Sequence, residues 1–318
     1  MIKVAISHSI FGDVQRGLAD DIAQLVELVG VDPNASDADL TEVAAAIRWD
    51  LSDQGFRSVL DQASSLKWLH SPGAGVEGWP LDELAARNIV LTNAAGVFAI
   101  PIAEWVLATM LSVAKQLHTI REAQHQHRWA ADVTPGELYG KTLLILGTGG
   151  IASQVISRAS SFGMRVWAAN RSGRPVPQAE RTVQGDAWRD LLPETDFIVS
   201  TLPLTEQTHG IIGAADLEAI KPGAWVINVG RGATIDEDAL LNAAQNGPLG
   251  GAALDVWTTE PLPADSPFWT TPNIIVSPHL SGESPAGRSR GLSLFTQNLS
   301  RFAAGQPLTN VVDLKAGY

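Results

Sequence analysis

Three residues that follow expected strands offer a fixed cation, a carboxylate and a titratable imidazole. Arg231 comes after WVINVG, Glu260 shortly after GAALDVW, and His279 after NIIVSP. Ligands of open parallel sheets bind beyond the carboxyl ends of the strands, so these side chains are expected at one edge. Each is ordinary alone, because loop arginines and glutamates are usually solvated and a histidine after a proline can simply cap a strand. Together they predict a catalytic site.

Such a set suits the reduction of a ketone by hydride. Hydride transfer leaves negative charge on the ketone oxygen, and His279 can donate the proton that this oxygen needs. Glu260 would orient the imidazole and stabilise its protonated form. Arg231 would hold a substrate carboxylate through paired hydrogen bonds and polarise the carbonyl next to it. The smallest substrate that uses all three groups is a 2-oxo acid.

A glycine-rich turn earlier in the chain predicts the source of the hydride. In KTLLILGTGGIA, residues 141–152, a strand runs into a turn and a helix opens near Ile151. Gly147, Gly149 and Ala152 match the dinucleotide motif G-x-G-x-x-G/A, which admits a pyrophosphate to the start of a helix. Such turns are common, so the motif is weak by itself. The expected cofactor contacts in this turn are Gly147, Thr148, Gly149, Gly150 and Ile151.

The end of the next strand, AANRSGR, favours NADP(H) over NAD(H). An acidic residue here usually binds the adenosine ribose hydroxyls, and Asn170 stands in its place. Arg171, Ser172 and Arg174 follow, and arginine offers a forked donor that matches a 2′-phosphate. The alternative is a solvated basic turn that contacts nothing. We therefore predict NADP(H) as the favoured cofactor and retain NAD(H) as the alternative.

The elements that must position these residues alternate between strand and helix, which predicts an α/β fold with parallel sheets. A first domain ends near Val97, and a second series starts at Thr142. In the first domain, expected strands cover residues 3–6, 43–49, 66–70 and 89–91, and expected helices cover 18–29, 54–63 and 81–86. In the second, expected strands cover residues 142–146, 165–169, 196–201, 224–229, 251–256 and 273–277.

Helix-end signals refine this pattern. Gly163 is suited to end the helix that follows the glycine turn. Thr234 and Glu237 have capping-box spacing before a helix over 236–246, and Gly247 closes it. A final helix over 285–304 has apolar residues on one face and could return to cover the first domain. Those apolar residues are Leu292, Phe295, Leu299 and Phe302.

Composition narrows the possible partners. The chain has 318 residues, 45% of them hydrophobic and 18% charged, which is typical of a soluble globular protein with room for two domains. A net charge of −12 argues against nucleic acid but allows a small anionic substrate. The chain has no cysteine, which suits a reducing cytoplasm. No signal peptide is expected at the N-terminus.

Two other segments could suggest a membrane span or a metal site, but we prefer a purely structural interpretation of both. Residues 94–114 are apolar enough to suggest a membrane span, but Pro101 and Glu104 favour a buried helix that joins two domains. His118, His125 and His127 suggest a metal or second site, but a polar helix end or subunit contact is the better interpretation. We therefore predict no membrane contact and no metal.

Over nearly its whole length the sequence resembles the D-isomer-specific 2-hydroxyacid dehydrogenases, with the basic strand end resembling their glyoxylate/hydroxypyruvate reductase branch. The resemblance rests on an ordered set of segments, which is far more specific than the glycine motif. They are HSPGAGV, NAAGVFAIPIAEWVLA, LYGKTLLILGTGGIA, STLPLTEQTHGIIG, WVINVGRGATIDEDAL, AALDVWTTEPLP and SPHLSG.

The resemblance implies two Rossmann-like domains with the active site in the cleft between them. A flavodoxin-like substrate domain would comprise residues 1–98 and 287–318, and an inserted dinucleotide-binding domain residues 99–286. It also implies a D-2-hydroxy acid product and a homodimer joined through the cofactor domain. The residues at matching positions are Arg231, Glu260 and His279 for catalysis, Ala74 and Gly75 for the substrate carboxylate, and Leu202, Pro203 and Asp255 for the cofactor.

Two alternatives to a 2-hydroxyacid dehydrogenase occur among proteins of this fold. Glu260 stands where formate dehydrogenases carry a glutamine, so formate oxidation is not expected. Some proteins of this fold are dinucleotide-sensing interaction proteins such as corepressors, and the catalytic residues alone do not exclude that class. We expect an enzyme that acts on glyoxylate, hydroxypyruvate or a related small acid, because nothing in the sequence suggests a partner-binding tail.

Overall fold

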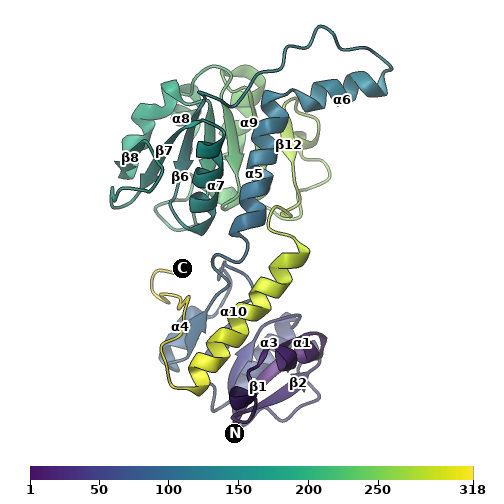
Figure 1. Ribbon diagram of the computed structural model, residues 1–318, viewed down its shortest axis with the longest axis vertical. Coiled ribbons are helices and arrows are strands. Elements are labelled where there is room, and N and C mark those ends of the chain that lie inside the picture. The colour runs from purple at the N-terminus through teal and green to yellow at the C-terminus, as the bar shows by residue number, and fades with distance from the viewer. Residues whose placement is uncertain (318) are drawn as a thin grey trace. The chain divides into compact units, whose positions relative to one another are not determined.

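The computed structural model describes residues 1–317 and divides into two compact units. Unit 1 comprises Met1–Phe98 together with the segment that starts at Ser284, and unit 2 comprises Ala99–Glu283. Each unit contains one parallel sheet with helices on both faces, as Figure 1 shows for the two sets of labelled elements. The predicted α/β class with two Rossmann-like domains is confirmed.

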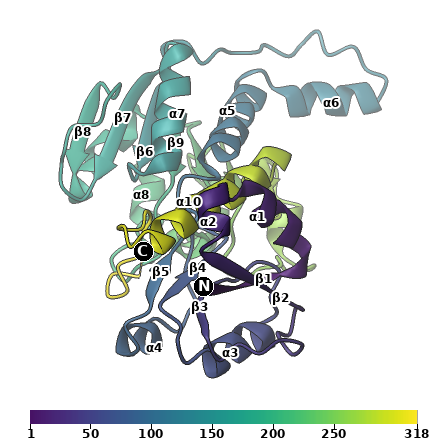
Figure 2. The same cartoon turned by 60° about the horizontal axis from the view of Figure 1, so that its bottom comes forward.

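Unit 1 is built on five parallel strands in the order β2-β1-β3-β4-β5, which is the flavodoxin-like order. Alternate residues of β1 serve two cores: Ala5 packs with α3 and α4, whereas Val4 and Ile6 pack with α1, α2 and α10 (Figure 2). The strands are β1 (Ile2–Ser7), β2 (Val26–Val31), β3 (Val43–Ile47), β4 (Trp68–His70) and β5 (Val90–Thr92). The helices are α1 (Phe11–Gly17), α2 (Asp20–Ala23), α3 (Asp53–Gln62), α4 (Leu81–Ala86) and α10 (Pro285–Ala303).

The expected helix over residues 18–29 is wrong. The segment forms the short helix α2 and then the edge strand β2, which pairs in parallel with β1 from Val26 to Val31. Leu18, Ile22 and Leu25 have helical spacing. The following VELVGV does not alternate strictly between apolar and polar residues, but it hydrogen-bonds to β1 as a strand. Pairing with a neighbouring strand therefore overrides the local pattern.

Helix α10 returns to unit 1, as its apolar face predicts. Leu292, Phe295 and Leu299 are buried in the core beside β1 and β4. The ring of Phe295 stacks on that of Trp68 with centroids 5.4 Å apart. The last helix thus completes the core of the first unit.

His70, the last residue of β4, is fully buried beneath these rings. Its Nδ1 lies 2.7 Å from Thr92 Oγ1, and its Nε2 has no hydrogen-bond partner among residues 1–317. Burial lowers the pKa of His70 to about 4. The imidazole is therefore neutral in the folded protein at neutral pH.

We expect the free energy of unfolding to fall as the pH drops from about 6.5 towards 4. An unfolded histidine has a pKa of about 6.5, so in this window the unfolded chain binds a proton that the folded chain does not. A depression to about 4 corresponds to a loss of about 3 kcal/mol at pH 4. Urea unfolding across this range measures it. His70→Gln should reduce the dependence of the free energy of unfolding on pH, whereas the control His8→Gln, at an exposed histidine, should not. An equal pH dependence in all three proteins would contradict the assignment.

Unit 2 is built on seven parallel strands in the order β12-β11-β10-β9-β6-β7-β8. The chain order reverses between β6 and β9, and ligands of such sheets bind at this switch point. The strands are β6 (Thr142–Leu146), β7 (Arg165–Asn170), β8 (Arg181–Gln184), β9 (Phe197–Ser200), β10 (Trp225–Asn228), β11 (Gly251–Leu254) and β12 (Ile274–Val276). The short edge strand β8 is absent from the sequence-based prediction.

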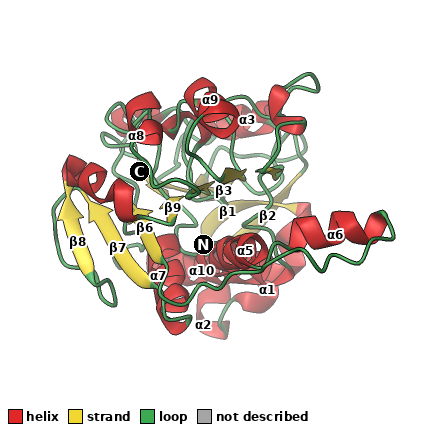
Figure 3. Ribbon diagram, turned by 90° about the horizontal axis from the view of Figure 1, so that it is seen from above, coloured by secondary structure: helices red, strands yellow, loops and turns green. Residues whose placement is uncertain are grey.

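Two helix pairs cover the two faces of this sheet. Leu143 and Ile145 of β6 pack with α5 and α7, whereas Leu144 and Leu146 pack with α8 and α9. Figure 3 shows these pairs on opposite sides of the strands. The helices are α5 (Ala99–Ala114), α6 (Leu117–His125), α7 (Gly150–Ser161), α8 (Ala214–Glu218) and α9 (Glu237–Asn246).

The helix-end predictions for unit 2 have mixed outcomes. Gly163 lies just past α7 with φ +71°, as expected for a glycine that ends a helix. The capping box of Thr234 and Glu237 is wrong, because Asp236 caps α9 by accepting from the N–H of Ala239. The Glu237 carboxylate instead accepts from the N–H of Thr258.

Helix α5 occupies most of the apolar segment 94–114. Ala103, Val106 and Met110 are buried against α7, whereas Glu104 is exposed and its carboxylate lies 3.9 Å from Arg158 of α7. Within the described part of the chain, no helix is both long and apolar enough to cross a bilayer.

Candidate active site

The turn between β6 and α7 depends on glycine at its first position. Gly147 has φ +89°, and a Cβ there would lie 2.8 Å from Thr201 Oγ1. Gly149 precedes the first helical residue, Gly150, and no side chain caps this end of α7. Ala152 is fully buried where α7 packs on the sheet. The first N–H groups of α7 are thus available for a pyrophosphate.

Strand β9 ends beside this turn. The N–H and Oγ1 of Thr201 both donate to the carbonyl of Leu146, at 2.9 and 3.0 Å. A Cβ on Gly147 would also approach the side chain of Leu202 to 3.4 Å. Leu202 and Pro203 therefore lie at the switch point, next to the glycine turn.

Asn170 organises the basic segment at the end of β7. Its Oδ1 accepts from the N–H and Oγ of Ser172, both at 3.1 Å, and its Nδ2 donates to the carbonyl of Arg174 at 2.9 Å. Arg171, Ser172 and Arg174 are exposed. An aspartate could accept the same bonds but could not donate to Arg174, so the amide fixes the course of this turn.

Arg231 lies beyond β10 between two glycines that allow a very close approach of backbones. A Cβ on Gly230 would lie 2.5 Å from the carbonyl oxygen of Leu202, and one on Gly232 would lie 2.0 Å from the carbonyl carbon of Trp257. The carbonyl of Arg231 accepts from Asn228 Nδ2 at 3.0 Å. These contacts hold the Arg231 backbone tightly, and the residue as a whole is half-buried.

His279 and Glu260 form a hydrogen-bonded pair. The distance from His279 Nδ1 to Glu260 Oε2 is 2.8 Å, and the side chains are 53% and 37% exposed. Glu260 Oε1 accepts from the N–H of Trp257 at 2.9 Å, which holds the carboxylate in place. Because an ionised carboxylate can only accept, Nδ1 carries the donated proton and Nε2 is left to exchange a proton with a ligand.

Asp255 holds the loop that carries His279. The carboxylate is buried and accepts from Ser277 Oγ at 2.5 Å, from the N–H of Leu280 at 2.9 Å, and from both the N–H and Oγ of Ser281. His279 lies inside this loop with φ +57°. The support of the loop at 277–281 by Asp255 was not predicted, because its partners lie more than twenty residues away. The predicted nicotinamide contact of Asp255 stays a prediction.

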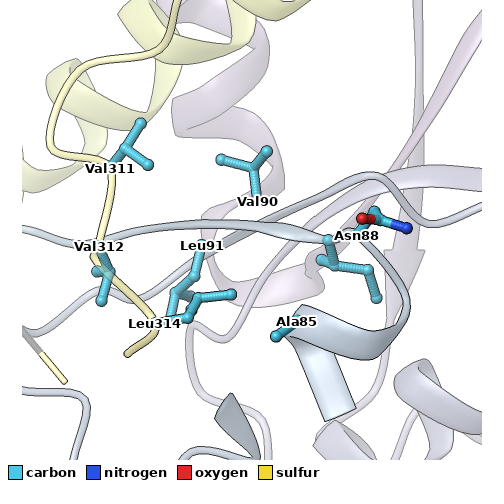
Figure 4. Close-up of a pocket in the computed structure, with 8 residues that line it drawn as sticks. Ala85, Asn88, Val90, Leu91, Val311, Val312 and Leu314 are labelled. Carbon is cyan, nitrogen blue, oxygen red and sulfur yellow. The ribbon is translucent and has the colours of Figure 1, made fainter. Parts of the chain in front are cut away.

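The structure places the remaining predicted site residues in unit 1. Ala74 and Gly75 lie in the loop at 71–76 between β4 and α4, with Ala74 exposed and Gly75 half-exposed. A shallow pocket of about 320 Å³ also lies in unit 1, between β5 and the C-terminal segment (Figure 4). None of the predicted site residues lines this apolar pocket.

The histidine segment lies on α6 and just after it. His118 and His125 lie on α6, where His125 Nε2 accepts from Arg121 Nε at 3.3 Å, and His127 follows the helix with φ +52°. Residues 1–317 contain no group of three histidine or acidic side chains that could hold a metal ion.

Comparison with known proteins identifies the family of the chain. The family model for the D-isomer specific 2-hydroxyacid dehydrogenase, NAD binding domain, matches residues 107–281. A glyoxylate reductase from Korarchaeum cryptofilum is 31% identical over 83% of this chain and 81% of the relative. A glyoxylate/hydroxypyruvate reductase B from Pectobacterium carotovorum is 33% identical over 81% of this chain and 82% of the relative.

Solved structures agree over almost the full length. A D-isomer specific 2-hydroxyacid dehydrogenase family protein from Aeromonas salmonicida has a TM-score of 0.86 and 36% identity over 98% of this chain and 99% of its own. An NADPH-dependent glyoxylate/hydroxypyruvate reductase from Sinorhizobium meliloti, in complex with NADP and sulfate, has a TM-score of 0.84 and 28% identity, covering 99% of both chains. The chain therefore belongs to the D-isomer specific 2-hydroxyacid dehydrogenase family.

Proposed function

We propose that the protein reduces a small 2-oxo acid, such as glyoxylate or hydroxypyruvate, to the D-2-hydroxy acid with NAD(P)H. The observation that carries this proposal is the hydrogen bond of 2.8 Å between His279 Nδ1 and Glu260, which leaves Nε2 for a substrate. Arg231 follows a strand of the same sheet and supplies the cation. The reductase names of the relatives from Korarchaeum and Pectobacterium support the substrate class.

We assign a separate role in this reaction to each of the three residues. When bound, a reduced nicotinamide would supply the hydride that C2 of the 2-oxo acid accepts. Arg231 binds the substrate carboxylate with paired hydrogen bonds and polarises the adjacent carbonyl. Nε2 of His279 gives its proton to the carbonyl oxygen, and Glu260 stabilises the imidazolium before that transfer. In the reverse direction the neutral Nε2 takes the hydroxyl proton.

In unit 1, we assign the backbone N–H groups of Ala74 and Gly75 to binding of a substrate carboxylate. Both residues lie in a turn with glycines at 73 and 75, and such turns can present several N–H groups to an anion.

A kinetic panel tests the proposed function. Purified protein is given glyoxylate, hydroxypyruvate and larger 2-oxo acids with NADPH and with NADH, and oxidation of the cofactor is followed by absorbance. Turnover of a small 2-oxo acid supports the enzyme. Tight cofactor binding without turnover across the panel would favour the other class, a dinucleotide-sensing interaction protein.

For the cofactor we propose NADP(H) in preference to NAD(H). The basic segment held by Asn170 is exposed at the end of β7, where a 2′-phosphate would lie in this fold. The Sinorhizobium structure, which contains NADP, supports this preference.

Replacing Arg171 and Arg174 together by alanine should raise KM for NADPH at least tenfold and change KM for NADH little. Each charge-assisted hydrogen bond to a phosphate contributes roughly 1.5–3 kcal/mol, and NADH has no phosphate there. Steady-state kinetics with both cofactors measures the change. Arg165→Ala, at the opposite end of the same strand, is the matched control. A parallel rise in KM for NADPH and NADH would contradict 2′-phosphate recognition.

We further propose a homodimer formed through unit 2. Figure 1 shows α6 and the segment after it extending from the rest of this unit. Their apolar side chains are exposed, among them Trp129 at 91% and Leu117 at 50%. Such a patch is typical of a subunit interface. Light scattering would test this proposal, since a mass of one chain would contradict a homodimer.

The cysteine-free composition also fits our proposal of a cytoplasmic enzyme.

A further inference from the structure

The loop at 71–76 presents backbone donors that the rest of the described chain leaves unused. Within residues 1–317, the N–H groups of Ala74 and Gly75 make no hydrogen bond. The carbonyl groups of the preceding residues are occupied: that of Gly73 accepts from the N–H of Ala94 at 2.9 Å and from Ser71 Oγ at 3.1 Å. That of Ala74 accepts from Asn93 Nδ2 at 2.7 Å. The loop is therefore fixed through its carbonyl groups.

These bonds determine where the free N–H groups point. The carbonyl of Ala74 and the N–H of Gly75 belong to one planar trans peptide group, in which they point in opposite directions. When Asn93 draws the Ala74 carbonyl towards β5, the Gly75 N–H must point away from β5. The bonds to the Gly73 carbonyl orient the Ala74 N–H in the same manner.

Asn93 is itself held firmly. It is 7% exposed, and its Oδ1 accepts from the N–H of Ala95 at 3.1 Å. Its own backbone N–H donates to the carbonyl of Asn310 at 3.1 Å, and Asn310 Nδ2 donates to the carbonyl of Ala95 at 2.8 Å. The neighbouring N–H of Val312 donates to Leu91, and Figure 4 shows this segment beside β5. Asn93 is therefore anchored by the C-terminal segment.

That segment is anchored in turn by α10. Asn298 is fully buried, and its Nδ2 donates to the carbonyl of Thr309 at 3.0 Å. Its Oδ1 accepts from the N–H and Oγ1 of Thr309, both at 2.9 Å. A continuous series of amide hydrogen bonds thus connects α10 to the loop at 71–76.

We propose that Asn93 is a positioning residue for the substrate carboxylate, because its side-chain amide aims the Gly75 N–H at that group. The inference rests on the proposed function, in which Ala74 and Gly75 bind the carboxylate of a 2-oxo acid. Asn93 does not touch the substrate; it acts through the Ala74 carbonyl.

The test compares Asn93→Asp with Asn93→Ala. Aspartate keeps an acceptor for the Ala95 N–H but cannot donate to the Ala74 carbonyl when ionised, whereas alanine loses both contacts. We expect Asn93→Asp to raise KM for the 2-oxo acid about tenfold or more, as for a lost hydrogen bond to a charged group. Both kcat and KM for NADPH should stay within about twofold, because those functions belong to residues of unit 2.

A purely structural role gives a different result. Combined loss of kcat and NADPH affinity, or an unchanged KM for the 2-oxo acid in folded Asn93→Asp, would overturn the inference. Thermal unfolding verifies that Asn93→Asp is folded. The matched control is Asn88→Asp, the same change at an exposed residue with φ +55°, a conformation that aspartate tolerates, and its KM should equal that of the unchanged protein.

Oxamate binding separates this inference from the proposed function. Calorimetry in the presence of NADH measures binding of this 2-oxo-acid analogue without turnover. If the unchanged protein reduces no 2-oxo acid but binds oxamate, and Asn93→Asp weakens that binding about tenfold, the proposed function fails and the role of Asn93 stands. Equal affinity in both proteins, or no oxamate binding by the unchanged protein, would overturn the role of Asn93.

Discussion

Replacement of His279 by asparagine should lower kcat by a factor of about 10²–10⁴ and leave NADPH affinity nearly unchanged. The side chain is proposed to supply the proton that the ketone oxygen needs, and asparagine cannot supply it. The cofactor, by contrast, is expected at the glycine turn and at the end of β7. Steady-state kinetics and fluorescence titration of NADPH measure the two quantities separately.

Asparagine is a better replacement than alanine because of the backbone. His279 has φ +57°, a conformation that asparagine tolerates more readily than alanine. His279→Asn therefore removes the imidazole with little added strain in the loop held by Asp255. Glu260→Gln should have a smaller effect, because the amide can still hydrogen-bond to the ring but no longer stabilises its positive charge.

A matched control exists in unit 1. His8 Nε2 lies 3.1 Å from Asp37, so it also belongs to an exposed histidine–carboxylate pair. We expect His8→Asn to leave kcat unchanged. If His279→Asn retained the full kcat, the acid–base role would have to be assigned to another group.

The sequence predicts the residues of the site better than it predicts the hydrogen bonds that hold those residues in place. Arg231, Glu260 and His279 follow predicted strands, and the rule for ligands of parallel sheets places them at one edge. The structure brings Glu260 and His279 into a direct hydrogen bond. The support of these residues depends on partners distant in sequence: Asp255 bonds to Ser281, and Asn93 bonds to Asn310 across 217 positions. No local pattern contains such pairs.

The same distinction explains the fold. Alternating strands and helices predict the α/β class, because buried parallel strands and amphipathic helices have distinct sequence patterns. Two of the edge strands lack this signal: β2 has mostly half-buried residues, β8 has exposed ends, and the prediction missed both, whereas it found the edge strands β5 and β12. The strand conformation of β2 and β8 depends on pairing with β1 and β7, which becomes evident only in the assembled sheets.

Arg231→Ala should lower kcat/KM for 2-oxo acids by about 10²–10³, with a higher KM and a lower kcat. Alanine removes the forked donor that is proposed to hold the carboxylate and polarise the carbonyl. The adjacent backbone should change little, because Gly230 and Gly232 are packed against neighbouring backbone and the Arg231 carbonyl accepts from Asn228. Steady-state kinetics with saturating NADPH measures both parameters, and Arg158→Ala on α7 serves as an arginine control.

Arg231→Lys distinguishes charge from geometry. Lysine keeps the positive charge but is a point donor without the planar fork, so it should recover only part of the lost kcat/KM. If KM rises and kcat does not change in Arg231→Ala, the arginine binds ground state and transition state equally, and the proposed polarisation of the carbonyl is wrong. If neither parameter changes, the carboxylate is bound by other donors, and the backbone N–H groups that Asn93 orients become the leading candidates.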